Sequence, residues 1–169
     1  MSLKIFCDIA DYRIIKKFNK LKIVKGFTTN PSLMRASGAK NYKQYSLKIL
    51  KICKTKPISF EVFADDTEGM IRQGHKIKSW GKNVYVKIPV VNSKGEFTGR
   101  VIKELSSNNV KLNITAVYTY AQVKKIVKVA GHKNTKLNSA FSRDLIKKIR
   151  VSRLCSMMKI TNTQKQSLV

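Results

Sequence analysis

Short apolar stretches alternate with longer amphipathic stretches along most of this chain. The short stretches are rich in β-branched residues and predict strands at 3–8, 22–27, 57–64, 83–91 and 110–117. Apolar residues at helical spacing predict helices between and after them, at 11–21, 41–54, 65–80, 97–108 and 119–130. Strands that alternate with helices indicate an α/β fold, in which helices cover a parallel sheet.

Two architectures share this alternation, the open doubly wound sheet and the closed (β/α)8 barrel. The sequence has no GxGxxG and no GxxxxGK[ST] motif, so the nucleotide-binding folds that carry these motifs lose their main support. A complete barrel needs about 200 residues or more, whereas this chain has 169. The run TTNPS at 28–32 predicts a turn in which Ser32 can cap the next helix.

The charge balance is strongly basic, with 35 Lys+Arg against 9 Asp+Glu and a formal net charge of +26. Such an excess suggests nucleic acid or another polyanion as a partner. Only seven of the basic residues are arginines, however, and the lysines are spread along the whole chain without stacking aromatics among them. A Lys-rich background is therefore favoured over nucleic-acid binding, which stays as an alternative.

The three cysteines and two histidines are too widely spaced for a disulfide framework or a metal site. No apolar run approaches the roughly 18 residues of a membrane span. Asp8 also interrupts the region where a signal peptide needs a long apolar stretch. We expect a cytoplasmic protein with no metal, no cofactor and no membrane partner.

Polar residues lie within or just after each of the five predicted strands. They are Asp8, Asn30, Glu61, Lys87, Asn113 and Thr115. The carboxyl ends of parallel strands are where the chemistry of α/β proteins collects. We therefore expect these side chains to form one site.

Lys87 lies inside an apolar strand, where a charged side chain is costly unless it is paired or neutral. Burial favours the neutral amine, which can condense with a ketone to a Schiff base. Asp8 and Glu61 could move the protons that this chemistry needs, through a water held by Thr115. The alternative is structural: Lys87 reaches solvent from an edge strand, or Asp8 or Glu61 neutralises it.

These segments together resemble the transaldolase family, in the small single-barrel subclass that includes the fructose-6-phosphate aldolases. The matching stretches are FCDIAD, GFTTNPSL, ISFEVFADD, SWGKNVYVKIPV, KLNITAVYTYAQ and VKVAGHK, in family order over about residues 3–133. The resemblance implies a TIM (β/α)8 barrel, of which this chain shows the first five to six βα units. It also implies a class I, Schiff-base mechanism without a metal.

The resemblance implies catalytic roles for four residues. Lys87 matches the Schiff-base lysine and Asp8 the acid/base aspartate. Glu61 and Thr115 match the residues that hold the catalytic water. The aldolase branch tends to have Gln where this chain has Glu61, which favours a transaldolase.

The resemblance also implies a set of substrate-binding residues. Asn30 and Asn113 match the asparagines that hold substrate hydroxyls and the carbinolamine. Thr28 and Ser32 match family positions of less certain role. Arg143 resembles the arginine that grips the substrate phosphate, although its spacing is one residue short and no glycine precedes it.

The implied reaction transfers a dihydroxyacetone unit between sugar phosphates, as in the non-oxidative pentose phosphate pathway. A fructose-6-phosphate aldolase-like lyase is the alternative, and a homo-oligomer is compatible with both. Residues 134–169 form a divergent basic segment, for which a frame shift and a shortened paralogue stay open as origins. A third hypothesis for the function is therefore an inactive truncated paralogue or a basic polyanion-binding module.

Overall fold

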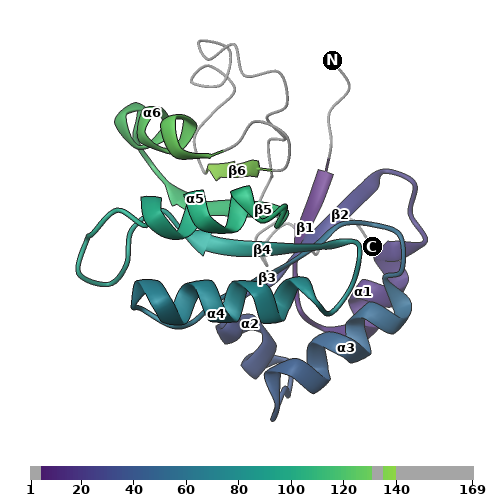
Figure 1. Ribbon diagram of the computed structural model, residues 1–169. Helices are drawn as coiled ribbons and strands as arrows, with labels where there is room; N and C mark the ends of the chain where they lie inside the picture. The colour runs from purple at the N-terminus through teal and green to yellow at the C-terminus, as the bar shows by residue number, and fades with distance from the viewer. Residues whose placement is uncertain (1–4, 131–134, 140–169) are drawn as a thin grey trace.

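The structure is a computed structural model that describes residues 5–130 and 135–139. It contains six strands joined into one sheet (Figure 1). The strands are β1 (Ile5–Asp8), β2 (Val24–Thr28), β3 (Ile58–Glu61), β4 (Val84–Pro89), β5 (Leu112–Val117) and β6 (Thr135–Ser139). The helices are α1 (Tyr12–Asn19), α2 (Pro31–Ala36), α3 (Tyr42–Ile52), α4 (Thr67–Lys78), α5 (Gly99–Ser107) and α6 (Tyr120–Val129).

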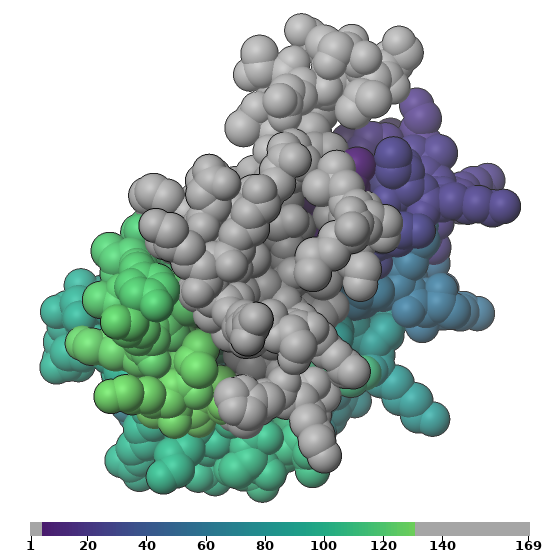
Figure 2. All heavy atoms as spheres, turned by 90° about the horizontal axis from the view of Figure 1, so that it is seen from above, coloured from purple at the N-terminus to yellow at the C-terminus, as the bar shows by residue number. Residues whose placement is uncertain are grey.

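The strands pair in parallel and in the order of the sequence, from β1 to β6. A doubly wound sheet reverses its strand order at a switch point, whereas a (β/α)8 barrel keeps the chain order around the sheet. The described strands follow the chain order throughout. In the view from above, the colours of the described atoms run around the molecule from purple through teal to green (Figure 2). The chain therefore has the architecture of a TIM barrel over five βα units and a sixth strand.

All five predicted strands and all five predicted helices are present, with ends within three residues of the predicted ones; β2 alone extends past its predicted range, by one residue to Thr28. The TTNPS segment differs from the prediction because the turn leads directly into α2. Asn30, rather than Ser32, is the N-cap, and its side-chain oxygen accepts a hydrogen bond of 2.8 Å from the backbone N–H of Leu33. Pro31 then takes the first helical position, where the missing N–H of proline costs nothing.

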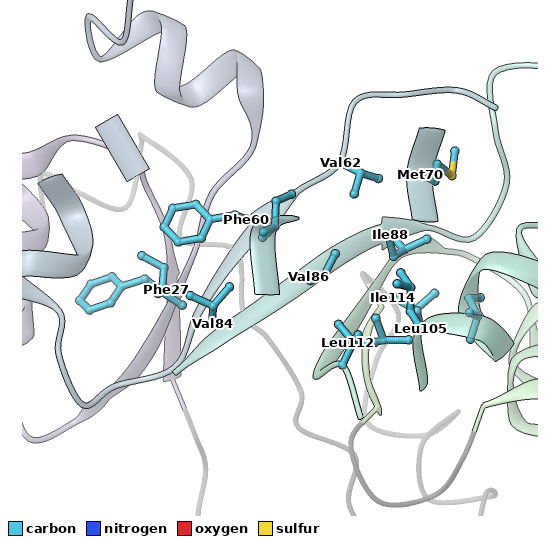
Figure 3. Close-up of a cluster of buried hydrophobic side chains, with 14 of the residues drawn as sticks. Phe27, Phe60, Val62, Met70, Val84, Val86, Ile88, Leu105, Leu112 and Ile114 are labelled. Atoms are coloured by element: carbon cyan, nitrogen blue, oxygen red, sulfur yellow. The ribbon is translucent and has the colours of Figure 1, made fainter. Parts of the chain in front are cut away.

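The hydrophobic core lies between the helices and one face of the sheet. Because side chains alternate across a strand, the register aligns Phe60 with Val86 and Val86 with Leu112 on this face. Each of these side chains is fully buried, and Figure 3 shows them among their neighbours in the core. The residues between them therefore point to the opposite, inner face of the sheet, the face that becomes the interior of a barrel.

Side-chain contacts also hold the helix ends in place. Asp66 caps α4 by accepting a hydrogen bond of 2.7 Å from Gly69 N–H. Lys56, which precedes β3, donates to the carbonyls of Asn19 and Leu21 at the end of α1, at 2.6 and 2.8 Å. Within residues 5–130 and 135–139, none of the helices combines the length and the hydropathy that crossing a membrane requires.

Candidate active site

The inner face of the sheet has a polar stripe of six residues. In neighbouring strands, the register aligns Asp8 with Thr28 and Ser59, and it aligns Glu61 with Lys87 and Asn113. Register partners in a parallel sheet point to the same face, and so do residues two apart on one strand. Five predicted site residues, namely Asp8, Thr28, Glu61, Lys87 and Asn113, are thus brought together with Ser59.

Lys87 is buried, with only 5% of the residue exposed. Its Nζ lies 3.2 Å from Glu61 Oε2 and donates a hydrogen bond of 3.3 Å to the carbonyl of Thr29. Lys87 therefore does not reach out to solvent, and Glu61 is its charge partner. A buried ion pair of this kind keeps both charges compatible with burial, and it also supplies a nearby proton acceptor for the amine.

The Asp8 carboxylate is held by Thr28 on the neighbouring strand. Thr28 Oγ1 donates a hydrogen bond of 2.7 Å to Asp8 Oδ1, and Thr28 is only 2% exposed. A hydroxyl that donates to a carboxylate fixes its orientation. The structure thus places Thr28 as the residue that orients the aspartate.

Asn113 is fully buried beside Ser59, and its Nδ2 donates a hydrogen bond of 3.0 Å to Ser59 Oγ. Our sequence analysis missed Ser59. The period of two in the run ISFE could have revealed it, because Ser59 lies two residues before Glu61 and must share its face.

Three further candidates lie at the carboxyl ends of the strands. The side-chain oxygen of Asn30 accepts the hydrogen bond that caps α2. Ser32 is exposed in the first turn of α2. Thr115 lies two residues after Asn113, where β5 bulges: the register with β6 shifts between Ile114 and Val117. Arg143 lies outside the described residues.

Ala116, the residue after Thr115, has a left-handed backbone with φ of 58°. Residues other than glycine adopt this conformation at some cost, and such strain clusters at functional sites. A bulge re-aims the side chains around it. The partly exposed Thr115 is thus placed by a local departure from regular strand geometry at the end of β5.

Sequence analysis also missed Tyr42, which lies in the helix predicted at 41–54. The Tyr42 hydroxyl contacts the backbone N and O of Glu61, each at 3.0 Å. No sequence signal predicts this contact, because it joins α3 to the end of β3 only in the folded chain. In the described part of the chain, no three His, Cys, Asp or Glu side chains gather in a way that could hold a metal ion.

The chain is similar to known proteins in sequence and in fold. The family model described as "Transaldolase/Fructose-6-phosphate aldolase" matches residues 5–157 of this chain. The matched range extends beyond residue 133, where the stretch of motifs that resemble the family ends.

Curated relatives carry a related name. A "Probable transaldolase" from Sulfurihydrogenibium sp. (strain YO3AOP1) is 37% identical over 129 residues, which cover 76% of this chain and 57% of that protein. A "Probable transaldolase" from Clostridium acetobutylicum is 38% identical over 120 residues, which cover 71% of this chain and 53% of that protein. The chain therefore spans about half the length of the curated relatives it matches.

Among solved structures, the fold is similar to that of a dihydrodipicolinate synthase from Rhodopseudomonas palustris, with a TM-score of 0.63 and 13% identity. The similarity covers 94% of this chain and 63% of that chain. At this identity the match supports the fold alone.

Proposed function

The chain belongs to the transaldolase/fructose-6-phosphate aldolase family, and we propose that it performs class I, Schiff-base chemistry on a ketose phosphate, with Lys87 as the nucleophile. The observation that carries this proposal is the position of Lys87. Its amine is buried on a polar sheet face, 3.2 Å from a carboxylate that can take its proton.

The first steps use the Lys87–Glu61 pair. Transfer of the ammonium proton from Lys87 to Glu61 leaves a neutral amine, which attacks the ketone carbon of the sugar and forms a carbinolamine. Protonation of the carbinolamine hydroxyl releases water and leaves an iminium. Glu61, now carrying a proton within reach of the reacting nitrogen, is placed to return it in this dehydration.

Cleavage of the carbon–carbon bond then needs a base at the neighbouring hydroxyl. We assign this role to Asp8, whose carboxylate is oriented by Thr28. As the hydroxyl proton moves to Asp8, the C3–C4 bond breaks and its electron pair passes into the iminium. An aldose phosphate leaves, and a dihydroxyacetone enamine stays attached to Lys87.

Asn113 and Thr115 complete the proposed site. Asn113 aligns with Lys87 in the register, which supports its proposed contact with the carbinolamine. Thr115 follows on the same strand as the proposed holder of the catalytic water. In a transaldolase, the enamine attacks a second aldose phosphate; in a lyase, a proton replaces that acceptor. We favour the transfer reaction of the non-oxidative pentose phosphate pathway, in the cytoplasm, because Glu61 stands where aldolases tend to have Gln.

The proposal is tested by trapping the iminium. Incubation of the protein with fructose 6-phosphate and borohydride should attach a reduced sugar fragment to the peptide that contains Lys87. Lys87→Met should abolish the adduct. Lys111→Met is the matched control. Lys111 is close in sequence to the site residue Asn113, but its Nζ donates to the carbonyl of Lys82. This variant should therefore keep the adduct. A folded wild-type protein without any adduct would overturn the proposed activity.

A second measurement distinguishes transfer from cleavage. Glyceraldehyde 3-phosphate and sedoheptulose 7-phosphate should yield erythrose 4-phosphate and fructose 6-phosphate if the chain is a transaldolase. Release of free dihydroxyacetone from fructose 6-phosphate, without a gain on adding an acceptor aldose, would indicate the lyase instead.

A further inference from the structure

Tyr42 occupies a place next to β3 that a neighbouring strand would normally fill. The pairing of β2 with β3 ends at Thr28 and Ser59, and one more hydrogen bond follows, from Thr29 N–H to the Ser59 carbonyl at 3.0 Å. After Thr29 the chain turns into α2. The backbone N–H and C=O of Glu61 point to the same edge as those of Ser59, because residues two apart on a strand face the same neighbour.

The Tyr42 hydroxyl meets both of these backbone groups. It accepts a hydrogen bond from the N–H of Glu61 and donates one to the C=O of Glu61, each with a length of 3.0 Å. On the opposite edge, the N–H of Val62 donates to the carbonyl of Lys87 at 3.1 Å. The end of β3 is therefore held from both sides, by β4 and by a tyrosine of α3.

The ring of Tyr42 is itself held by aromatic neighbours. Its ring packs edge-on against the ring of Phe63, with 5.0 Å between the ring centroids, and its centroid lies 5.9 Å from that of Trp80. Burial raises the pKa of Tyr42 above its ordinary value, an effect that exceeds the opposing influence of its hydrogen bond to the Glu61 backbone. The hydroxyl thus stays protonated and can donate at any physiological pH.

We propose that Tyr42 is a positioning residue for the reaction at Lys87, which fixes the end of β3 so that the Glu61 carboxylate stays beside the amine. Glu61 is the last residue of β3, where a strand frays most readily, and its side chain reaches Lys87 from that position. The inference rests on the proposed function, since it assigns Tyr42 a part in the same chemistry. Tyr42 touches the backbone of Glu61, so it acts through Glu61.

The experiment compares Tyr42→Phe with Tyr45→Phe. Tyr45 is a matched control, because it lies on the same helix and its hydroxyl donates to the backbone carbonyls of Ala10 and Ser37 at 3.2 and 3.1 Å. Both variants lose one hydroxyl with two backbone contacts. Only Tyr42→Phe removes the contact with Glu61.

The first readout is the rate of borohydride-trapped adduct formation as a function of fructose 6-phosphate concentration. Tyr42→Phe should lower the limiting rate about tenfold and leave the half-saturating sugar concentration unchanged, because displacing a reacting group by about 1 Å slows chemistry by up to 10²-fold. Tyr45→Phe should leave both parameters near those of the wild type. Equal limiting rates for the two variants would overturn the inference.

The second readout needs no sugar, so it judges Tyr42 even when no adduct forms and the proposed function fails. Formaldehyde and an amine form an iminium, which cyanoborohydride reduces to a methylamine; this is the attack on a carbonyl that we propose for Lys87 and the sugar, with Glu61 taking the proton. Tyr42→Phe should therefore slow the methylation of Lys87 about threefold relative to Tyr45→Phe, as followed by peptide mass spectrometry at one fixed pH. Exchange of the Glu61 amide proton should also quicken in Tyr42→Phe alone. An unchanged rate of Lys87 methylation together with unchanged exchange of the Glu61 amide would refute the positioning role, whether or not a sugar adduct forms.

Discussion

Glu61 and Lys87 are register partners on neighbouring parallel strands, and Glu61 Oε2 lies 3.2 Å from Lys87 Nζ. Their side chains are 18% and 7% exposed, so the pair is held largely away from water. Each charge is tolerated there because of the other. The same closeness that stabilises the pair gives the amine a proton acceptor.

The ion pair predicts strong coupling between two substitutions. Lys87→Met and Glu61→Gln should each lower the free energy of unfolding by about 3 kcal/mol, because each leaves the partner charge buried without its counter-charge. The double variant should cost about 2 kcal/mol less than the sum of the two single variants. Urea unfolding of all four proteins measures this cycle, and additive costs would contradict a coupled pair.

Gly26 on β2 has no room for a side chain. An added Cβ would lie 2.5 Å from Phe6 Cε1 and 2.6 Å from the Pro57 carbonyl oxygen, which belongs to the backbone and cannot rotate away. Gly26→Ala should therefore lower the unfolding free energy by about 2 kcal/mol or more. Gly81→Ala is the control, since its Cβ would meet its nearest atom only at 3.3 Å; equal losses in the two variants would argue against this packing.

Cys53 should be unreactive in the folded protein. Burial raises the pKa of its thiol to about 11, although the nearby Lys56 acts in the opposite direction. The thiolate is the nucleophile, so native Cys53 should react with iodoacetamide at pH 8 on the order of a hundredfold more slowly than in urea. Peptide mass spectrometry after timed labelling gives both rates, and similar rates would show that the thiol is accessible.

Asp65 ties the segment after β3 to the loop after β4. Its carboxylate accepts hydrogen bonds from the N–H and the hydroxyl of Ser93 at 2.8 and 2.5 Å, and these bonds lower the pKa of Asp65. A carboxyl whose folded pKa is depressed contributes stability above its unfolded pKa of about 3.9, and this contribution is lost as the pH falls through the folded value. Ser93→Ala should raise the pKa of Asp65, as seen by carbon NMR of the carboxyl. Ser79→Ala, which removes a hydroxyl from the end of α4, should leave it unchanged.

The regular elements could be predicted from the sequence because their signals are local. The run of apolar, β-branched residues in segments such as 83–91 depends only on near neighbours along the chain. The short helix α2 was missed because the turn residues Asn30 and Pro31 also begin a helix well. A six-residue helix is too short to show a clear period.

The candidate site was predictable in its residue types but not in its contacts. Polar residues in apolar strands identified Asp8, Glu61 and Lys87, and the register places them on one face. Their catalytic roles stay predictions. The bond from Thr28 to Asp8, the amide of Asn113 against Ser59 and the capping role of Asn30 depend on which segments become neighbours in space.

The sequence by itself thus determined an alternating α/β chain and a lysine inside an apolar strand, where its charge is costly unless it is paired or neutral. The tertiary structure decided that the strands follow one another in chain order, that Glu61 is the partner of Lys87, and that Tyr42 takes the place of a strand beside Glu61. The physical reason is the separation along the chain of the residues that interact. Periodicity is set by near neighbours along the chain, whereas register and the end of a strand pairing are set by contacts between residues far apart in the sequence.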